Sequence, residues 1–486
     1  MVTTQSFCLI DEPWIPILRL DGRFERVGIR VVLTEAARIR QLAATNPMDN
    51  VALLRFLLAV VYWCKGVPPI PDERDQILAD SGFPSEWLSR LEEHRDCFNL
   101  LGDGERFYQN SAYKGRSPEH TSDYLIHEVP SGTNKWLFRH ATDHVDGLCR
   151  ACCAMGLVRL PVFATSAGKG MSASTGKSFG INSKPPLYVI PVGTSLANTL
   201  LFSWQTPTCE LGTPAWECPG GKLPSSGEVP LLTGLTWLPR SVWLANPEES
   251  KSTCISCGRK DRVIRHCVFD GKGSSKTESR VWRDPHVIYE TSKTGKVSTI
   301  QTSNALDSEN AAAGNWASCL AAILRGQKVC KEATLWIVGF STVQNDKYLE
   351  ATEWCLSFLD SSENHQELVA KLDQWKKEGA TLADQVRRNA SSRNRTVEIP
   401  PAIDAIRPDI EARVCRNVGE LLGGDPAAWD RAAQEYKPLM DVVAMSLSPG
   451  FTTQAVERRK QIAGVLPRMN LGVKSDKRKG KKGSRK

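Results

Sequence analysis

The alternation of apolar and polar positions near the start of the chain predicts β-structure. Residues 7–10, 14–20 and 24–27 are rich in apolar side chains, and Asp21-Gly22 separates the last two runs. Asp-Gly between apolar runs is a strong signal of a tight turn, so this part of the chain predicts a β-hairpin. Two further strands are predicted where short apolar runs end at turn-forming residues, at 187–192 and 333–340.

Apolar residues recur at intervals of three and four in other segments, which predicts helices. The most apolar stretch, residues 51–64 within a predicted helix over 47–64, contains Arg55 and is too short to span a bilayer. We therefore predict a buried core helix there. Shorter helices are predicted at residues 34–42, 73–80, 85–94, 195–204 and 305–324. Residues 111–146 and 206–235 lack a regular period and are predicted to be irregular.

From about residue 362 the pattern changes to successive helices separated by glycine and proline. These helices are predicted at 364–389, 401–422, 427–447 and 453–465. Apolar residues from Ile403 to Leu421 form one stripe, as in a helix that faces a bundle. The predicted fold class is α+β: a large mixed domain over residues 1–361, a four-helix bundle over 362–466, and a disordered tail over 467–486.

The net charge of +8 is informative about nucleic-acid binding only when its distribution along the chain is considered. Eight Lys and Arg residues and one Asp lie between Lys474 and Lys486, so the tail carries +7 and the rest of the chain about +1. The tail either serves as a solubilising end or attracts nucleic-acid phosphate weakly. A nearly neutral body argues against a protein that coats nucleic acid, so specific contacts should come from a few basic residues.

Two C-x-x-C motifs are the strongest chemical signal in the sequence. Cys149 and Cys152 form the first and Cys254 and Cys257 the second, with Gly258 directly after it. This spacing lets two thiolates bind one tetrahedral metal, and two such motifs favour a structural zinc site with four cysteine ligands. The alternative is four ordinary buried or free cysteines. Fifteen cysteines without a secretory leader pattern lead us to expect a reducing cytoplasm, with no membrane as partner.

Other motifs give weaker signals. The Gly/Ser/Lys segment 166–178 resembles a phosphate-binding loop, but Met171 stands where that motif requires glycine, so we reject nucleotide hydrolysis. The segment is either a flexible linker or a loop whose backbone approaches a ligand closely. His140 and His144 are alternative metal ligands, although such a pair is more often solvent-facing. A zinc hydrolase would need an open metal position and a general base, and no H-E-x-x-H motif is present.

Several motifs in order resemble one known family. They are the Asp11-Glu12-Pro13-Trp14-Ile15-Pro16 segment, the two cysteine pairs with the glycine-containing loop between them, Pro185-Pro186-Leu187-Tyr188, and Trp282-x-Asp284-Pro285-His286. Together with the helical C-terminal region, this set resembles the CasA family, the large subunit of the type I-E CRISPR surveillance complex Cascade. The resemblance extends over nearly the whole chain.

The resemblance implies a DNA-reading subunit and not an enzyme. Guide RNA (crRNA) bound by other Cascade subunits would read the target sequence, while this subunit would recognise the protospacer-adjacent motif in double-stranded DNA and begin strand separation. It would also help to recruit the helicase-nuclease. Residues 128–136 would seat the subunit near the 5′ end of the guide, and the C-terminal bundle would line the path of the target DNA.

The resemblance also assigns roles to particular residues. A glycine loop near the DNA would comprise Ala167, Gly168, Lys169 and Gly170, although its lysines and serines depart from the family pattern. Lys272, with Lys276 as second choice, would enter the minor groove, and Gln344 would act as a wedge beneath the motif. Each lysine and Gln344 could instead be a solvated loop residue. The competing function is a zinc-stapled scaffold protein of a multisubunit assembly that does not read DNA itself.

Overall fold

Helices and strands are mixed along the computed structural model of the chain. It describes residues 6–118, 120–126, 147–164, 181, 186–271, 279–287, 289–291, 297–299, 333–343, 347–357 and 453. The chain divides into two compact units. The first unit comprises residues 1–287 and 338–353, and the second comprises residues 288–337 and 354–486. Most of the described residues, including both cysteine pairs, belong to the first unit.

The described elements alternate between helix and strand through the first unit. The α-helices are α1 Ile29–Thr34, α2 Pro47–Lys65, α3 Pro71–Ala79, α4 Ser89–Glu93, α5 Arg150–Arg159, α6 Leu196–Ser203 and α7 Leu231–Thr236. The strands up to the second cysteine pair are β1 Ile15–Arg19, β2 Phe24–Val27, β3 Ile39–Leu42, β4 His120–Thr121, β5 Leu148–Cys149, β6 Tyr188–Val192, β7 Ser226–Glu228, β8 Arg240–Leu244 and β9 Lys251–Thr253. The later strands are β10 Lys260–Ile264, β11 His266–Gly271, β12 Ser279–Val281, β13 Tyr289–Thr291, β14 Val297–Thr299, β15 Thr334–Val343 and β16 Lys347–Ser357.

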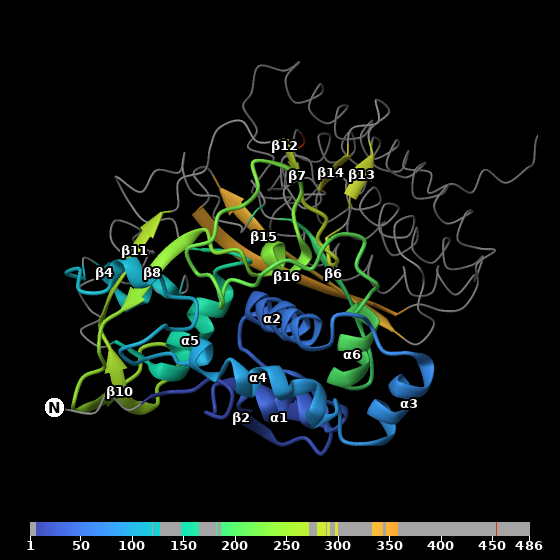
Figure 1. The fold of residues 1–486 in the computed structure, drawn as a ribbon, viewed down its shortest axis with the longest axis horizontal. Helices are drawn as coiled ribbons and strands as arrows, with labels where there is room; N and C mark the ends of the chain where they lie inside the picture. The colour runs from blue at the N-terminus through green and yellow to red at the C-terminus, as the bar shows by residue number, and fades with distance from the viewer. Residues whose placement is uncertain are drawn as a thin grey trace, which may run out of the picture. The chain divides into compact units, whose positions relative to one another are not determined.

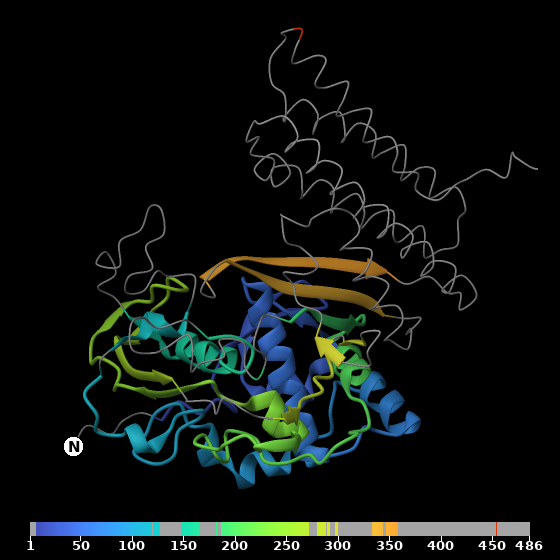
Figure 2. The ribbon, with the colours of Figure 1, turned by 90° about the horizontal axis from the view of Figure 1, so that it is seen from above.

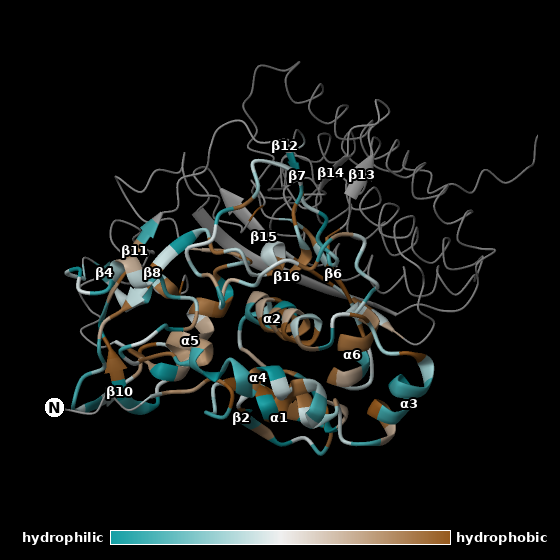
Figure 3. Cartoon of the chain, viewed as in Figure 1, coloured by the Kyte–Doolittle hydropathy of each residue, from teal (hydrophilic) through white to brown (hydrophobic). Residues whose placement is uncertain are grey.

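Helix α2 is the centre of the first unit's hydrophobic core, as the sequence predicts. The Asn46 side chain caps its start by accepting a hydrogen bond from the Met48 N–H at 2.9 Å, and Pro47 occupies the first turn. Gly66, with φ of +84°, ends the helix. Helices α5, α6 and α7 pack against α2, which is apolar along most of its length (Figures 1 and 3). Its length and apolar composition would suit a membrane span, but 83% of its most apolar window is buried inside the protein.

Two charged residues of α2 are buried, and each is neutralised by an ion pair. Asp49 accepts hydrogen bonds from Nε and Nη2 of Arg159 at 2.7 and 2.5 Å, which connects α2 to α5. Arg55 donates from Nη1 to Asp284 at 2.5 Å. Removing one member of a buried pair would leave an uncompensated charge. The two ion pairs therefore fix the position of α2 relative to α5 and to the segment that contains Asp284.

The N-terminal hairpin is confirmed, but the helix predicted over residues 34–42 is wrong. Strands β1 and β2 pair with Ile15 opposite Val27. Helix α1 ends at Thr34, and β3 follows and pairs with the other edge of β1, giving the order β2-β1-β3. Ile39 and Leu42 at the ends of β3 are buried while the two residues between them are exposed, so packing against β1 overrides local helix preference.

Other differences concern element ends, short elements and one long strand, β16. Residues 85–94 form a 3-10 turn over Ser85–Leu88 followed by α4, and not one helix. The segment 206–235 contains β7 and α7, so it is less irregular than predicted. The predicted strands at 187–192 and 333–340 are confirmed as β6 and β15, and β16 was not predicted. These three strands form a sheet in the order β16-β15-β6, with β15 and β16 in orange in Figure 2.

Four further sheets complete the described topology, and β10 and β11 are the central strands of two of them. Strand β10 pairs with β5 and with β9, and β11 pairs with β4 and with β8. Strands β7 and β12 form a parallel pair, and β13 and β14 an antiparallel one. The predicted helix over 305–324, the C-terminal four-helix bundle over 362–466 and the basic tail over 467–486 lie outside the described residues, apart from Thr453.

Candidate functional site

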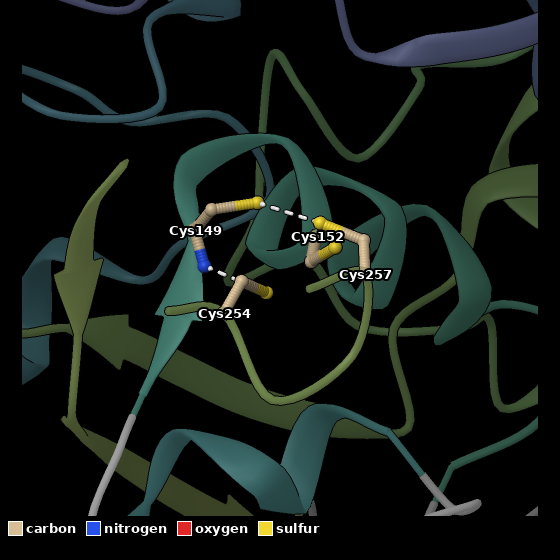
Figure 4. A group of neighbouring side chains, drawn as sticks. All are labelled: Cys149, Cys152, Cys254 and Cys257. Carbon is tan, nitrogen blue, oxygen red and sulfur yellow. Dashed lines mark hydrogen bonds between the residues drawn. The ribbon is translucent and has the colours of Figure 1, made fainter. Parts of the chain in front are cut away.

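The first cysteine pair lies where β5 passes into α5. Cys149 is both the last residue of β5 and the N-cap residue of α5, with extended backbone angles. Cys152 follows in the first turn of the helix, which turns its side chain to the same side as that of Cys149 (Figure 4). The neighbouring Cys153 is not part of this pair, since its Sγ is 3.9 Å from the Leu148 carbonyl oxygen. The positive end of the α5 helix dipole favours thiolates at this position.

The second pair lies in the tight turn between β9 and β10. The Cys254 N–H donates to the Arg259 carbonyl at 2.8 Å, and the Gly258 N–H donates to the Cys254 carbonyl at 2.9 Å. Gly258 has φ of +71°, in the left-handed region where glycine is favoured. The C-x-x-C-G sequence therefore folds into a compact turn in which both sulfurs face the same side.

Strand pairing brings the two turns together across about a hundred residues of sequence. In the β5–β10 pair, Cys149 lies opposite Val263 and Leu148 opposite Ile264. Gly147 allows this approach, because a Cβ atom at that position would lie 2.3 Å from the Ile264 carbonyl oxygen. In the part of β10 that pairs with β9, Asp261 forms an ion pair with Arg150 of α5 at 3.0 Å. The sheet and the ion pair therefore hold the two cysteine turns next to each other.

The four sulfurs converge, which confirms the prediction that these cysteines form one cluster. All four Sγ atoms lie within 4.8 Å of one another (Figure 4). The distance from Cys149 Sγ to Cys257 Sγ is 3.7 Å, and the Cys149 N–H donates to Cys254 Sγ at 3.3 Å. A disulfide would require a sulfur–sulfur distance of about 2.05 Å. Four sulfurs at about 2.3 Å from a tetrahedral metal would instead be about 3.8 Å apart, close to the observed separation.

The electrostatics of the cluster favour thiolates on the second turn. Hydrogen bonding from the Cys149 and then the Cys152 thiol lowers the pKa of Cys254 to about 6. The same two thiols, with Cys254, lower the pKa of Cys257. The pKa of Cys152 is raised, first by its contact with Cys149, because a further charge among four close sulfurs is disfavoured without a cation. A bound metal cation would remove this repulsion.

Arg26 is a neighbour of the cluster that the sequence analysis missed. Its Nη1 lies 4.0 Å from Cys257 Sγ, although the two residues are 231 positions apart. Burial alone would lower the pKa of Arg26, but the charges of Cys152, Cys257 and Cys149 outweigh it and raise that pKa. A positive charge here partly compensates thiolate charge. Only the position of β2 beside the cluster reveals this role, so spacing in the sequence could not have found it.

The donor set determines what the cluster can do. Four cysteine sulfurs fill the positions of a tetrahedral metal and leave none for a water molecule or substrate. The arrangement suits a structural metal that connects two distant segments. It does not suit the hydrolase mechanism considered from the sequence, which needs an open coordination position.

The predicted DNA-contact residues lie outside the described part of the chain. These are Ala167, Gly168, Lys169 and Gly170 of the glycine loop, together with Lys272 and Gln344. The alternative lysine Lys276 and the pair His140 and His144 also lie outside it. Two of these residues nevertheless come directly after strands that the structure describes. Lys272 directly follows the end of β11 at Gly271, and Gln344 directly follows the end of β15 at Val343.

The Trp282-x-Asp284-Pro285-His286 motif contains a turn at Pro285 and His286, and the structure assigns it a packing role. Asp284 pairs with Arg55 of α2 and accepts a hydrogen bond from the His286 N–H at 2.9 Å. The Arg55 guanidinium also lies over the Tyr188 ring, 5.3 Å from its centroid. The sequence signal that could have indicated a buried acidic partner is the position of Arg55 inside the apolar stretch 51–64.

Comparison with known proteins identifies the family. The model of the family described as CRISPR-associated protein Cse1 matches residues 9–441 of the 486. The chain belongs to the Cse1 family. This confirms the resemblance found in the sequence, because CasA and Cse1 are names of the same protein in its curated relative.

Individual relatives of this Cse1-family chain agree with the assignment. CRISPR-associated protein CasA/Cse1 of Thermus thermophilus is 31% identical over 259 residues, and the chain spans about half the length of this curated relative. A solved structure of Thermus thermophilus CasA matches with a TM-score of 0.66 at 19% identity, covering 96% of this chain and 99% of that one. A chain from a structure described as a CRISPR RNA-guided surveillance complex matches with a TM-score of 0.62 at 16% identity, covering 94% and 99%. These likenesses show a shared mixed helix-and-strand fold.

Proposed function

We propose that this Cse1-family chain is the non-catalytic DNA-recognition subunit of a CRISPR RNA-guided surveillance complex. The observation that carries the proposal is the family match over residues 9–441. The likeness of the fold to a chain of such a complex supports it, although that likeness by itself concerns only the fold. The subunit's partners would be guide-RNA-bound Cascade subunits with their crRNA, double-stranded target DNA, and the helicase-nuclease that it helps to recruit. It would act in the cytoplasm.

The cysteine cluster would hold one structural zinc ion. Cys149, Cys152, Cys254 and Cys257 have the donor type and the separations that tetrahedral zinc requires. Zinc would supply no reaction chemistry here. The thiolates would fix the ends of β5 and β9, and through β10 they would fix the start of β11, whose other end leads to Lys272.

The reading of the protospacer-adjacent motif would fall to a few residues at strand ends. Lys272 would enter the minor groove from the end of β11, and Gln344 would act as a wedge from the end of β15. The glycine loop over residues 167–170 would approach the groove with its backbone. Unstacking a base step costs about a few kcal/mol, so a wedge needs a stiff mounting such as a strand end. Minor-groove reading is degenerate, so several related motifs should be tolerated.

The rest of the predicted organisation belongs to the same proposal. A mixed domain over residues 1–361 would carry the metal centre and the reading loops, and a four-helix bundle over residues 362–466 would line the path of the DNA. The basic tail over residues 467–486 would add weak attraction to phosphate. The alternative function is a zinc-stapled scaffold without DNA reading. It has the same metal centre, but it predicts that Lys272 and Gln344 have no effect on DNA binding or opening.

The two functions are separated by substitutions in an assembled complex. Gln344→Ala should slow opening of a motif-bearing duplex, measured by fluorescence of a base analogue beside the motif, while initial binding falls only modestly. Lys272→Ala should weaken motif binding by about tenfold, in the range of 1–3 kcal/mol expected for one specific base contact. A duplex with a scrambled motif is the control. If both variants bind and open the motif-bearing duplex as the wild type does, the roles assigned to Lys272 and Gln344 are wrong. Equal binding of the motif-bearing and scrambled duplexes by the wild-type complex would instead favour the scaffold function.

A further inference from the structure

The hairpin formed by β9, the second cysteine turn and β10 has one strongly basic face. In its antiparallel register, Lys251 lies directly opposite Arg262, and Thr253 lies opposite Lys260. Residues directly opposite each other, and residues two apart in one strand, have side chains on the same face. Lys251, Lys260 and Arg262 therefore share one face, and Thr253 is the remaining member.

The other face of the same hairpin is turned toward the body of the protein. Its residues, Ser252 and Asp261, lie opposite each other and are both half-buried. Asp261 forms the ion pair with Arg150 of α5 at 3.0 Å. Because this face is held against α5, the basic face must point outward, and Lys251 and Lys260 are indeed exposed while Arg262 is half-buried.

Nothing in the described part of the chain neutralises the basic face. No ion pair there involves Lys251, Lys260 or Arg262, and the carboxylate of Glu248 is already paired with Arg265. Asp261, between Lys260 and Arg262 in sequence, lies on the other face and is paired with Arg150, and Glu249 precedes the first strand position. Like charges directly opposite each other destabilise a strand pair, so Lys251 facing Arg262 is unfavourable for the isolated protein. Such an arrangement fits a partner that brings negative charge.

The hairpin is also held rigidly at both ends. The cysteine turn fixes one end by the hydrogen bonds of Cys254 and Gly258, and the pairing of β10 with β5 fixes the other. Cations on a fixed strand lose less backbone freedom on binding than cations on a flexible loop. The geometry therefore favours a ligand with regularly spaced anionic groups, as in a nucleic-acid backbone.

We propose that Lys251, Lys260 and Arg262 bind backbone phosphates of the double-stranded DNA that flanks the recognised motif. The proposal rests on the DNA-reading function, since it places the hairpin on the same duplex as Lys272. Twelve residues separate Lys260 from Lys272, so the two are at most about 40 Å apart. One turn of duplex spans about 34–36 Å, so one DNA segment of about a turn can reach both. The contacts would add affinity without sequence preference.

A triple substitution with a charge-matched control tests the proposal. The hairpin variant carries Lys251→Gln, Lys260→Gln and Arg262→Gln. The control carries Arg38→Gln, Arg40→Gln and Lys222→Gln, which removes three positive charges from other exposed positions. Each chain is assembled with its guide-RNA-bound subunits. Binding of a motif-bearing duplex is then measured over a salt series, with a flank of about two helical turns and with the flank cut to a few base pairs.

Three phosphate contacts predict a specific result. The slope of log K against log salt should fall in magnitude by about 2.7 in the hairpin variant, because each contact contributes about 0.9. Lys260→Gln alone should lower it by about 0.9. The control should keep the wild-type slope, and cutting the flank should abolish the difference between variant and wild type. Removal of the opposed charges should also leave the hairpin variant at least as thermally stable as the wild type.

Other outcomes overturn the proposal. If the hairpin variant and the control have equal slopes on the long flank, the hairpin does not contact DNA. If the hairpin variant instead fails to assemble with guide RNA and the other subunits, the basic face binds one of those partners. Failure of the DNA-reading function itself would look different, because the wild-type complex would then bind motif-bearing and scrambled duplexes equally.

Discussion

His286 shows how strongly burial can change the chemistry of one residue in this fold. It is almost fully buried, and neither ring nitrogen has a hydrogen-bond partner among the residues that the structure describes. Burial, and then the positive charge of Arg55, lower the pKa of His286 to about 4, while Asp284 opposes this effect in part. The imidazole is therefore neutral in the folded protein at neutral pH.

This lowered pKa predicts a loss of stability in acid. An unfolded histidine has a pKa of about 6.5, so between pH 6.5 and 4 the unfolded chain takes up a proton that the folded chain does not. The free energy of unfolding should fall over this window, by about 3 kcal/mol when complete, because one pKa unit corresponds to about 1.4 kcal/mol. Denaturant unfolding of the wild type and of His286→Leu at several pH values measures the difference between the two pH profiles.

The variant should lose this component of the pH dependence, whatever its stability at pH 7. His266→Gln removes an exposed imidazole and is the matched control. A His286→Leu profile as steep as that of the wild type would show that His286 is not the responsible group.

Single residues also show where sequence reasoning succeeds and where it stops. The four cysteines could be grouped because C-x-x-C spacing carries its chemistry locally. Arg26 could not, since its contact with Cys257 depends on where β2 packs. The same holds for Lys251 and Arg262, whose opposition depends on the register of the β9–β10 pair and not on their distance in sequence.

At the scale of elements, the short helix α7 depends on the absence of a side chain at Gly234. A Cβ atom there would lie 2.0 Å from Cζ3 of Trp282, the first residue of the buried turn motif. Gly234→Ala should therefore lower the free energy of unfolding by about 1–3 kcal/mol, the usual effect of overpacking a core. The clash should outweigh the gain in helix propensity, which is about 1 kcal/mol.

Denaturant unfolding followed by tryptophan fluorescence measures this change. Gly104→Ala is the control, because no atom lies within 4 Å of its added Cβ and its φ is not positive. Equal stability of Gly234→Ala and the control would mean that the Trp282 ring can move aside freely.

Elements with a strong local period were predicted well, and those that depend on pairing were not. Helix α2 was predicted because its long apolar run is typical of a buried helix, and the structure places Asn46 and Gly66 at its ends. Strand β3 was mistaken for part of a helix, because residues 34–42 favour a helix locally and Ile39–Leu42 become a strand only by pairing with β1. Helix α7 was missed because its six residues lie in a segment rich in glycine and proline.

At the scale of the whole molecule, the cysteine cluster joins segments that lie far apart in the chain. Cys149 and Cys257 are 108 positions apart and their sulfurs are 3.7 Å apart. Around them, β5 and β9 pair with β10 over two and three residue pairs, which is little contact to hold such a long connection closed. By the chain-entropy model, a crosslink that closes a loop of about a hundred residues stabilises a protein by about 4–5 kcal/mol.

Removal of the proposed zinc ion should therefore loosen this part of the first unit and spare the core helix. After treatment with a chelator, hydrogen exchange should accelerate in residues 147–160 and 251–264. Helix α2 should keep most of its protection, because α6 and α7 also pack against it and do not involve the cluster, while its contact with α5 weakens. Thermal unfolding of this region should shift to lower temperature. Cys257→Ser should behave like the chelated protein even with zinc present, and Cys218→Ser, at an exposed cysteine outside the cluster, should behave like the wild type. Identical exchange with and without chelator, in a protein shown to contain one zinc per chain, would mean that strand pairing alone holds the two segments together, and the metal would then have no structural role here.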